Sequence, residues 1–222
     1  MRVATYNVRG FRGGRDRVAH VVRGLDPDVL LLQETGSRRA LRRFAAITRM
    51  HVARDPWSPL RRRVKDAVLV RDGATITSAH LVRFAGSRRW YPRGALVARV
   101  GGSLDLWALS VHLGLGGRER VRQVEALLAT IATLPEAPIV VGGDLNATPD
   151  TRAPARMAAV LRDAWTAAGR GAGATFPAAA PAARIDYLFV GAGLEIRSIR
   201  VVSGPEAPAS DHLPVVATLR LS

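Results

Sequence analysis

The stretch PIVVGGDLNATPD, residues 138–150, joins an apolar run to two glycines and to the polar pair Asp144 and Asn146. A short aliphatic run with this ending predicts a buried strand, and glycines let the backbone approach a ligand closely. If the backbone stays extended, Asp144 and Asn146 alternate around Leu145 and point to the same side. An Asx turn explains the same letters, so a polar site and a simple turn both stay open at this point.

Polar side chains stand beside an apolar run at five further places along the chain. Four of the six clusters directly follow such a run, whereas Asp186 sits inside one and Asn7 lies near the end of the first. The further clusters are Asn7 in ATYNVRG, Gln33-Glu34 after DVLLL, His112 in LSVHLG, Asp186 in RIDYLFV and Ser210-Asp211-His212 in ASDHLPV. Oxygen ligands and imidazoles gathered at one sheet edge are typical of a divalent-metal phosphoesterase.

Taken one at a time, these clusters also have purely structural explanations. Glu34 could cap the end of a strand, and His112 could be a core residue with satisfied hydrogen bonds. His212 could be a solvated side chain at the start of the last strand, although an Asp next to a His recurs in phosphoryl chemistry. The prediction of an enzyme therefore depends on the joint pattern and on no single cluster.

Apolar periodicity predicts an alternation of strands and helices along the chain. Helices are expected at 15–25, 37–47, 118–133 and 153–164, a surface loop at 171–183, and strands at 2–8, 28–34, 66–71, 75–84, 94–100, 104–112, 138–144, 185–190, 194–202 and 213–221. The four strands from residue 66 to 112 are expected to meander. Because strands outnumber helices, we predict an α/β fold of four layers, in which two packed, mainly antiparallel or mixed sheets are flanked by helices.

The chain is strongly basic, with a formal net charge of +15 over 222 residues and a pI of about 11.7. Nearly all the positive charge is arginine, since Lys65 is the only lysine. A genome rich in G and C could explain arginine in place of lysine, but it does not explain the surplus of cations over anions. The surplus favours a polyanionic partner, either nucleic acid or an anionic lipid surface.

Length and residue usage narrow the class of protein further. A chain of this size is expected to form one domain over residues 1–222. The absence of cysteine excludes disulfides, thiol catalysis and a thiolate zinc site. A strand-like run begins by residue 3, which leaves no room for an apolar signal segment, and no apolar run reaches the length of a membrane span. We therefore expect a soluble, cytoplasmic protein without a membrane span. These features leave the oligomeric state open, and a monomer is only the default expectation.

The order of the six clusters resembles that of the endonuclease/exonuclease/phosphatase superfamily, which has a deoxyribonuclease-I-like fold. The resemblance runs from residue 3 to residue 219, and GGDLNATP and SDHLPV are its specific motifs. The superfamily includes deoxyribonuclease-I-like nucleases, exonuclease III-like repair enzymes, inositol-phosphate phosphatases and sphingomyelinases. Its fold is a two-sheet α/β sandwich flanked by helices, in agreement with the expected elements.

The resemblance implies a role for each polar side chain. Glu34 would be the principal ligand of Mg²⁺, or of Mn²⁺ in its place, with Asn7 and Asp211 completing the metal site. Asp144 would orient or deprotonate the attacking water, and Asn146 would hold that water and a phosphate oxygen. His212, oriented by Asp186, would stabilise the pentacovalent phosphate. The remaining implied residues are His112 at the phosphate or leaving group, Asp66 as the acidic partner of His112, and Arg93 on the substrate backbone.

The choice of phosphoester depends on the segments between the clusters. Basic groups fall in two expected loops, at 61–65 and 88–93, with Trp57, Trp90 and Tyr91 as exposed aromatic candidates. Loops of this kind could contact phosphates without reading bases, or could simply be solvated. His112 stands where exonuclease III-like enzymes usually carry Tyr, which places the chain nearer the deoxyribonuclease, phosphatase and sphingomyelinase branch.

Three functions stay open from the sequence. The first is a Mg²⁺-dependent nuclease of low sequence specificity acting on DNA or RNA. The second is a phosphatase or phosphodiesterase for inositol phosphates, lipid headgroups or other small phosphoesters. The third is a binding protein that kept the fold and lost the chemistry. The intact set of acidic residues and His212 argues against the third function.

Overall fold

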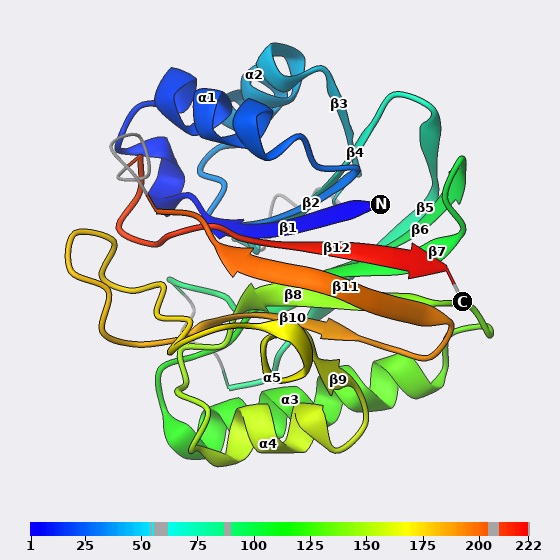
Figure 1. Ribbon diagram of the computed structural model, residues 1–222, viewed down its shortest axis with the longest axis vertical. Coiled ribbons are helices and arrows are strands. Elements are labelled where there is room, and N and C mark those ends of the chain that lie inside the picture. The colour runs from blue at the N-terminus through cyan, green and yellow to red at the C-terminus, as the bar shows by residue number, and fades with distance from the viewer. Residues whose placement is uncertain (54, 56–61, 87–89, 204–208, 222) are drawn as a thin grey trace.

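Two six-stranded sheets pack face to face and carry helices on their outer faces (Figure 1). The computed structural model describes residues 1–53, 55, 62–86, 90–203 and 209–221. One apolar cluster fills the space between the sheets. A second lies between the first sheet and its helices, and a third lies between the second sheet and its helices. The predicted four-layer α/β sandwich is therefore confirmed.

The first sheet combines the two ends of the chain, in the strand order β11-β12-β1-β2-β4-β3. Its strands are β1 (Arg2–Asn7), β2 (Val29–Gln33), β3 (Met50–Val52), β4 (Ala67–Arg71), β11 (Leu194–Val201) and β12 (Val215–Leu221). Strands β1 and β2 are parallel, and the other pairs are antiparallel. Helices α1 (Arg15–Leu25) and α2 (Arg38–Thr48) cover its outer face.

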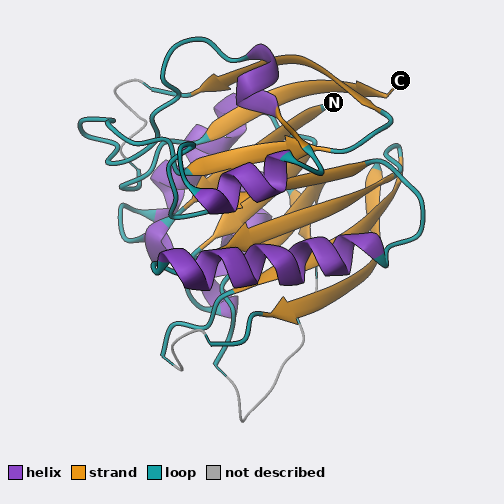
Figure 2. Cartoon of the chain, turned by 90° about the horizontal axis from the view of Figure 1, so that it is seen from below, coloured by secondary structure: helices purple, strands orange, loops and turns teal. Residues whose placement is uncertain are grey.

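The second sheet comes mainly from the middle of the chain, in the order β5-β6-β7-β8-β10-β9. Its strands are β5 (Ala74–Arg83), β6 (Gly94–Gly102), β7 (Leu106–His112), β8 (Ile139–Asp144), β9 (Arg162–Asp163) and β10 (Asp186–Val190). Strands β7 and β8 are parallel, because α3 (Gly117–Ala132) connects them. Helices α3 and α4 (Arg152–Ala158) lie across the outer face of this sheet (Figure 2).

The local sequence explains where the first two helices begin and end. Helix α1 buries Val18, Val22 and Leu25 on one face and ends at Asp26, which adopts a left-handed φ of 48°. Helix α2 begins after Ser37, whose Oγ accepts a hydrogen bond from the Ala40 backbone N–H at 3.1 Å. A serine cap of this kind satisfies one of the free N–H groups of the first turn.

The predicted helix over residues 153–164 is wrong in its second half. Helix α4 ends at Ala158, and the chain continues as the short strand β9 and then as α5 (Ala164–Ala168). Asp163 is the reason, because its Oδ1 accepts a hydrogen bond from the Trp165 backbone N–H and so caps a new helix. The same carboxylate forms a buried ion pair with Arg184. The apolar spacing up to Leu161 is compatible with one continuous helix, but these contacts favour a separate second helix that begins at Ala164.

The predicted four-strand meander from residue 66 to residue 112 is also partly wrong. Strands β5, β6 and β7 form an antiparallel meander in the second sheet, as expected. Strand β4 belongs to the first sheet instead, where it pairs with β2 and with β3, a strand that the sequence did not indicate. A turn at Gly73 therefore carries the chain from one sheet to the other.

The glycine at 143 is required by the close approach of two strands. A Cβ at Gly143 would lie 1.8 Å from the Val111 carbonyl oxygen, which is backbone of the neighbouring strand. We expect Gly143→Ala to lower the free energy of unfolding by roughly 1–3 kcal/mol or more, because backbone must shift to admit the methyl group. Urea denaturation measures this change.

Gly24→Ala is the matched control for this variant. Gly24 lies within α1, and a Cβ there would meet nothing within 4 Å. Alanine should therefore stabilise the protein by up to about 1 kcal/mol through its higher helix propensity. Equal stability of the Gly143→Ala variant and the wild type would contradict the close packing of β7 on β8.

Candidate active site

Strand register places the key polar residues in one row at the ends of neighbouring strands in each sheet. In the second sheet, Asp144 is directly opposite His112 on β7 and Asp186 on β10. Directly paired residues project to the same face, so the three side chains lie together. In the first sheet, Asn7 on β1 is paired with Gln33 on β2. Because both rows lie at the same end of the sandwich, residues far apart in sequence meet there.

Asp144 is the centre of this polar cluster and is only 1% exposed. Its Oδ2 accepts a hydrogen bond from Asn7 Nδ2 at 3.0 Å, which joins the two sheets. The same oxygen lies 3.2 Å from His112 Nε2 and 3.8 Å from His212 Nε2. Its Oδ1 accepts the Asn146 backbone N–H at 2.8 Å. This carboxylate therefore contacts groups from β1, β7 and the segment before β12.

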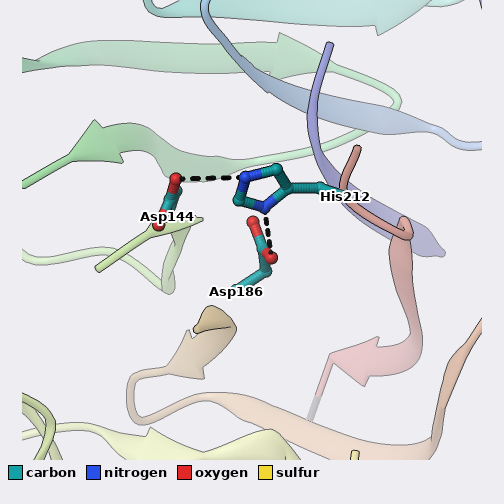
Figure 3. A group of neighbouring side chains, drawn as sticks. All are labelled: Asp144, Asp186 and His212. Carbon is teal, nitrogen blue, oxygen red and sulfur yellow. Dashed lines mark hydrogen bonds and ion pairs between the residues drawn. The ribbon is translucent and has the colours of Figure 1, made fainter. Parts of the chain in front are cut away.

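His212 lies between two buried carboxylates (Figure 3). Its Nδ1 is 2.9 Å from Asp186 Oδ2, which also accepts a hydrogen bond from Thr175 Oγ1 at 2.6 Å. The ring of Phe176 packs against the imidazole, with 4.9 Å between ring centroids. The arrangement fixes the ring and directs Nε2 toward Asp144.

The carboxylates keep His212 protonated near neutral pH. Burial by itself would lower the pKa of His212, but the charges of Asp186 and Asp144 outweigh it and raise the pKa to about 9. Burial would likewise raise the pKa of Asp144, but His112 and His212 hold it well below its usual range. At neutral pH the cluster therefore contains an imidazolium beside an ionised Asp144.

His112 is in contact with an arginine of the neighbouring connection. Arg93 Nη1 lies 2.6 Å from the ring nitrogens of His112. Asp66 is buried, and its Oδ2 has no hydrogen-bond partner among the described residues. Burial raises the pKa of Asp66 well above its usual value, against the opposing effect of Arg93 and Arg63. Its implied role as the partner of His112 stays a prediction.

A cavity of about 310 Å³ opens beside this cluster. Its lining combines the implied metal ligands, both candidate histidines and several cations: Asn7, Arg9, Gly10, Arg12, Glu34, Arg63, Lys65, Asp66, Trp90, Tyr91, Pro92, Arg93, His112, Asp211 and His212. Strand β2 ends at Gln33, and Glu34 turns away with a φ of 54°. Gln33 remains between the sheets and donates a hydrogen bond to Ser110 Oγ at 3.0 Å, so only the carboxylate of the pair reaches the cavity.

The backbone at Asn146 is not extended, so the structure decides between the two interpretations that the sequence left open. Its φ is 48°, and its own N–H closes a turn onto Asp144 Oδ1. The Asx turn that the sequence left open is thus present. The Asn146 side chain donates to the Leu113 carbonyl oxygen at 2.9 Å, so it braces the end of β7. The turn and the polar cluster coexist at this position.

Sequence reasoning missed two residues that complete the cluster. Arg9 Nε lies 3.1 Å from Asp211 Oδ2, and the Arg9 backbone N–H donates to Asn7 Oδ1. Its position in the YNVRG motif was a signal, since it is two residues from Asn7. Thr175, which binds Asp186, lies in the expected surface loop 171–183 and gave no signal. That loop is exposed over most of 177–182, but Thr175 is fully buried.

The predicted basic loops are described only in part. Arg62, Arg63 and Lys65 are described, as are residues 90–93. Trp57, Arg61, Arg88 and Arg89 lie outside the described residues. Among the described helices, none is long and apolar enough to cross a membrane.

Fold and cluster together define an α/β sandwich of the phosphoesterase type. The sequence profile of the Endonuclease/Exonuclease/phosphatase family matches residues 4–212, and the chain belongs to this family. The resemblance seen in the sequence is thereby confirmed. Members of the family are hydrolases that act on phosphoesters. A comparison with curated proteins found no match.

Solved structures share the fold over almost the whole chain. An endonuclease/exonuclease/phosphatase from Bacteroides vulgatus has a TM-score of 0.84 at 23% identity, covering 100% of this chain and 98% of that one. A mannosyl-6-phosphatase from Bacteroides thetaiotaomicron has a TM-score of 0.83 at 18% identity, covering 100% of both chains. TDP2 from D. rerio, in complex with a single-strand DNA product, has a TM-score of 0.78 at 16% identity, covering 99% and 98%. At these identities the similarity establishes the fold alone.

Two sets of side chains have the chemistry of metal ligands. Asp144, Asp186 and His212 offer ligand atoms that all lie within 4.8 Å of one another, and this group could hold a metal ion. Glu34, Asp211 and Asn7 form the second set, on the wall of the cavity. The second set contains only hard oxygen donors, which suit Mg²⁺.

The contact between Asp186 and His212 can be tested by titration. In the presence of EDTA, the His212 imidazole should titrate near pH 9 in the wild type. In Asp186→Asn its pKa should fall, because the largest stabilising charge is gone while the desolvation remains. The Cε1 proton resonance of His212 in an NMR pH titration reports this change. An unchanged His212 pKa in Asp186→Asn would contradict the coupling.

Proposed function

We propose that this protein is a Mg²⁺-dependent phosphodiesterase that hydrolyses nucleic acid with low sequence specificity. The observation that supports the proposal most is the buried group Asp144, Asp186 and His212 next to a cavity that His212 lines together with several cations. A phosphodiester resists attack because its oxygens are negatively charged. A site with an imidazolium and several guanidinium groups counters that charge.

Each buried side chain has a defined part in the proposed reaction. Asp144 is ionised and held from several sides, so it can orient a water molecule and accept its proton. His212 carries a positive charge and can stabilise the oxygens of the pentacovalent phosphate. Asp186 positions His212, and Thr175 positions Asp186. His112 and Arg93 lie on the cavity wall and can contact the phosphate or the leaving oxygen.

The oxygen ligands on the cavity wall are the proposed binding site for Mg²⁺. Glu34, Asp211 and Asn7 supply oxygen ligands at a cavity that can also admit water, and Mg²⁺ commonly keeps several waters beside one or two carboxylates. His212 is a poor ligand by comparison, because a metal-binding imidazole must be deprotonated and its pKa is raised to about 9. When bound, the metal ion neutralises phosphate charge and polarises the P–O bond.

A nucleic-acid substrate is supported by the charge of the cavity wall. Arg9, Arg12, Arg63, Lys65 and Arg93 all line it. Cations spaced around a cleft can follow a phosphate backbone without reading bases, which corresponds to low sequence specificity. The surplus of 15 positive charges over the chain is consistent with such a substrate.

The second candidate function is hydrolysis of a small phosphoester, such as an inositol phosphate or a lipid headgroup. The observation that favours it is the size of the cavity, about 310 Å³, which fits a small ligand. The mannosyl-6-phosphatase with the same fold supports this candidate. The single-domain organisation over 1–222, the monomeric state and the cytoplasmic location stay predictions.

Replacing either buried catalytic group should abolish most activity while the fold is retained. Asp144→Asn and His212→Ala should each lower kcat by roughly 10²–10⁴-fold, the range typical of general acid–base and electrostatic groups. The assay compares plasmid DNA, single-stranded DNA, RNA, an inositol phosphate, sphingomyelin and bis-p-nitrophenyl phosphate, with Mg²⁺ and with EDTA.

Exposed residues of the same type provide the controls for these variants. Asp105→Ala and His80→Ala should retain wild-type rates, and circular dichroism should show that all four variants are folded. Near-wild-type kcat in either active-site variant would contradict the assignment of the catalytic groups. Cleavage of the small esters alone would overturn nucleic acid as the substrate.

The two substrate classes differ in their response to salt. Nucleic-acid binding should weaken with a log–log slope of roughly −0.7 to −0.9 per phosphate contacted, so several contacts give a steep dependence. A small phosphoester should show only weak dependence. Measuring KM between low and physiological salt distinguishes them, and Lys65→Ala should make the slope for nucleic acid shallower by about one contact.

A further inference from the structure

Two consecutive aromatic residues line the cavity and are largely exposed. Trp90 and Tyr91 are 66% and 67% exposed, yet both line the same cavity as His112 and His212. Exposed aromatic side chains next to a reactive site are unusual because each could bury on the order of 150–250 Å² in a core. Their position suggests a contact surface for substrate.

The backbone holds these two side chains close to the reacting groups. Arg83 and Gly94 are paired across β5 and β6, and the Phe84 N–H donates to the Arg93 carbonyl oxygen at 3.0 Å. Arg93 in turn lies against His112. Tyr91 is two residues from Arg93, a span of about 7 Å at most. A group of the substrate that contacts Tyr91 is therefore close to the position proposed for the phosphate at the histidines.

A guanidinium group already stacks on one of the rings. Arg62 Cζ lies 4.1 Å from the centroid of the Trp90 ring, which is a cation–π contact. Its neighbour Arg63 is fixed by Asp55 at 2.7 Å and by Thr35 Oγ1 at 2.8 Å, so the segment that carries Arg62 is anchored. Because two thirds of the Trp90 side chain is still exposed, the ring remains accessible to a ligand.

Flat aromatic surfaces beside a cationic wall match the chemistry of unpaired nucleobases. Every base has a π-face that can stack on an aromatic side chain, while the cations follow the phosphates. In a duplex these faces are covered by neighbouring base pairs, so only single strands and frayed ends can stack in this way. A lipid tail would instead need an apolar wall, whereas Arg9, Arg12 and Lys65 line this cavity.

We propose that Trp90 and Tyr91 form a stacking platform for the unpaired bases next to the scissile phosphate. The inference rests on the proposed nuclease function and names its substrate class. The enzyme then prefers single-stranded nucleic acid, or single-stranded ends, over blunt duplex. Arg62 holds Trp90 in the orientation that receives the base.

The test compares three variants of Trp90 on three substrates with Mg²⁺. The substrates are a single-stranded oligonucleotide, the same sequence as a blunt duplex, and an inositol phosphate, a small ester that has neither a base nor an aromatic ring. Trp90→Leu should lower kcat/KM for the single strand by about tenfold more than for the small ester, the effect of one lost base stack. Trp90→Phe keeps a ring and should lose much less, and Trp90→Ala should resemble Trp90→Leu.

Val160→Ala is the matched surface control, since Val160 is 61% exposed and does not line the cavity. It should leave all three rates unchanged. A preference of the wild type for the duplex, or equal losses on the single strand and the small ester, would overturn the stacking platform. So would retention of activity in Trp90→Leu, since that indicates an apolar contact of the kind a lipid tail makes. Failure to cleave either nucleic acid while the small ester is hydrolysed would instead reject the proposed nuclease function itself.

Discussion

The site depends on a single buried carboxylate that is shared between the two sheets. Asp144 ends β8 in the second sheet and accepts a hydrogen bond from Asn7 of the first. A buried charge without partners is very costly, so this position is stable only when the surrounding donors are in place. Asn7, His112 and the Asn146 N–H lie within hydrogen-bond distance of the Asp144 oxygens, and His212 adds a positive charge 3.8 Å away. The packing of the sandwich and the electrostatics of the site are therefore one arrangement.

A second consequence of this arrangement is the charge state of His212. The imidazole lies between Asp186 and Asp144, and their combined charge outweighs the desolvation that would otherwise neutralise it. Thr175 and Phe176 then fix the carboxylate and the ring from a segment with little regular structure. Strands place the charged groups, while the loop before β10 limits how they can move. A site of this kind is preorganised for an anionic transition state.

The buried cluster and the exposed aromatic residues are held in place in different ways. The buried cluster is held by hydrogen bonds from several strands, whereas Trp90 and Tyr91 lie on a connection whose two ends are fixed at Arg83 and Gly94. Connections of this kind can vary in sequence while the sheet remains the same. This explains how one family can combine a common phosphate chemistry with different substrates. In this chain the connection carries aromatic rings beside arginines.

The sequence alone determined most of the strands and helices, the four-layer class and the polar clusters at strand ends. Apolar periodicity and glycine positions are local signals, and they are strong in 138–144 and in α1. The tertiary structure alone decided that β4 leaves the meander, that the short strand β9 pairs with β10 after α4 has ended, and that Arg93 contacts His112. It also brought in Arg9 and Thr175. These outcomes depend on contacts between residues far apart in sequence. The free energies of such contacts cannot be predicted from a local sequence pattern.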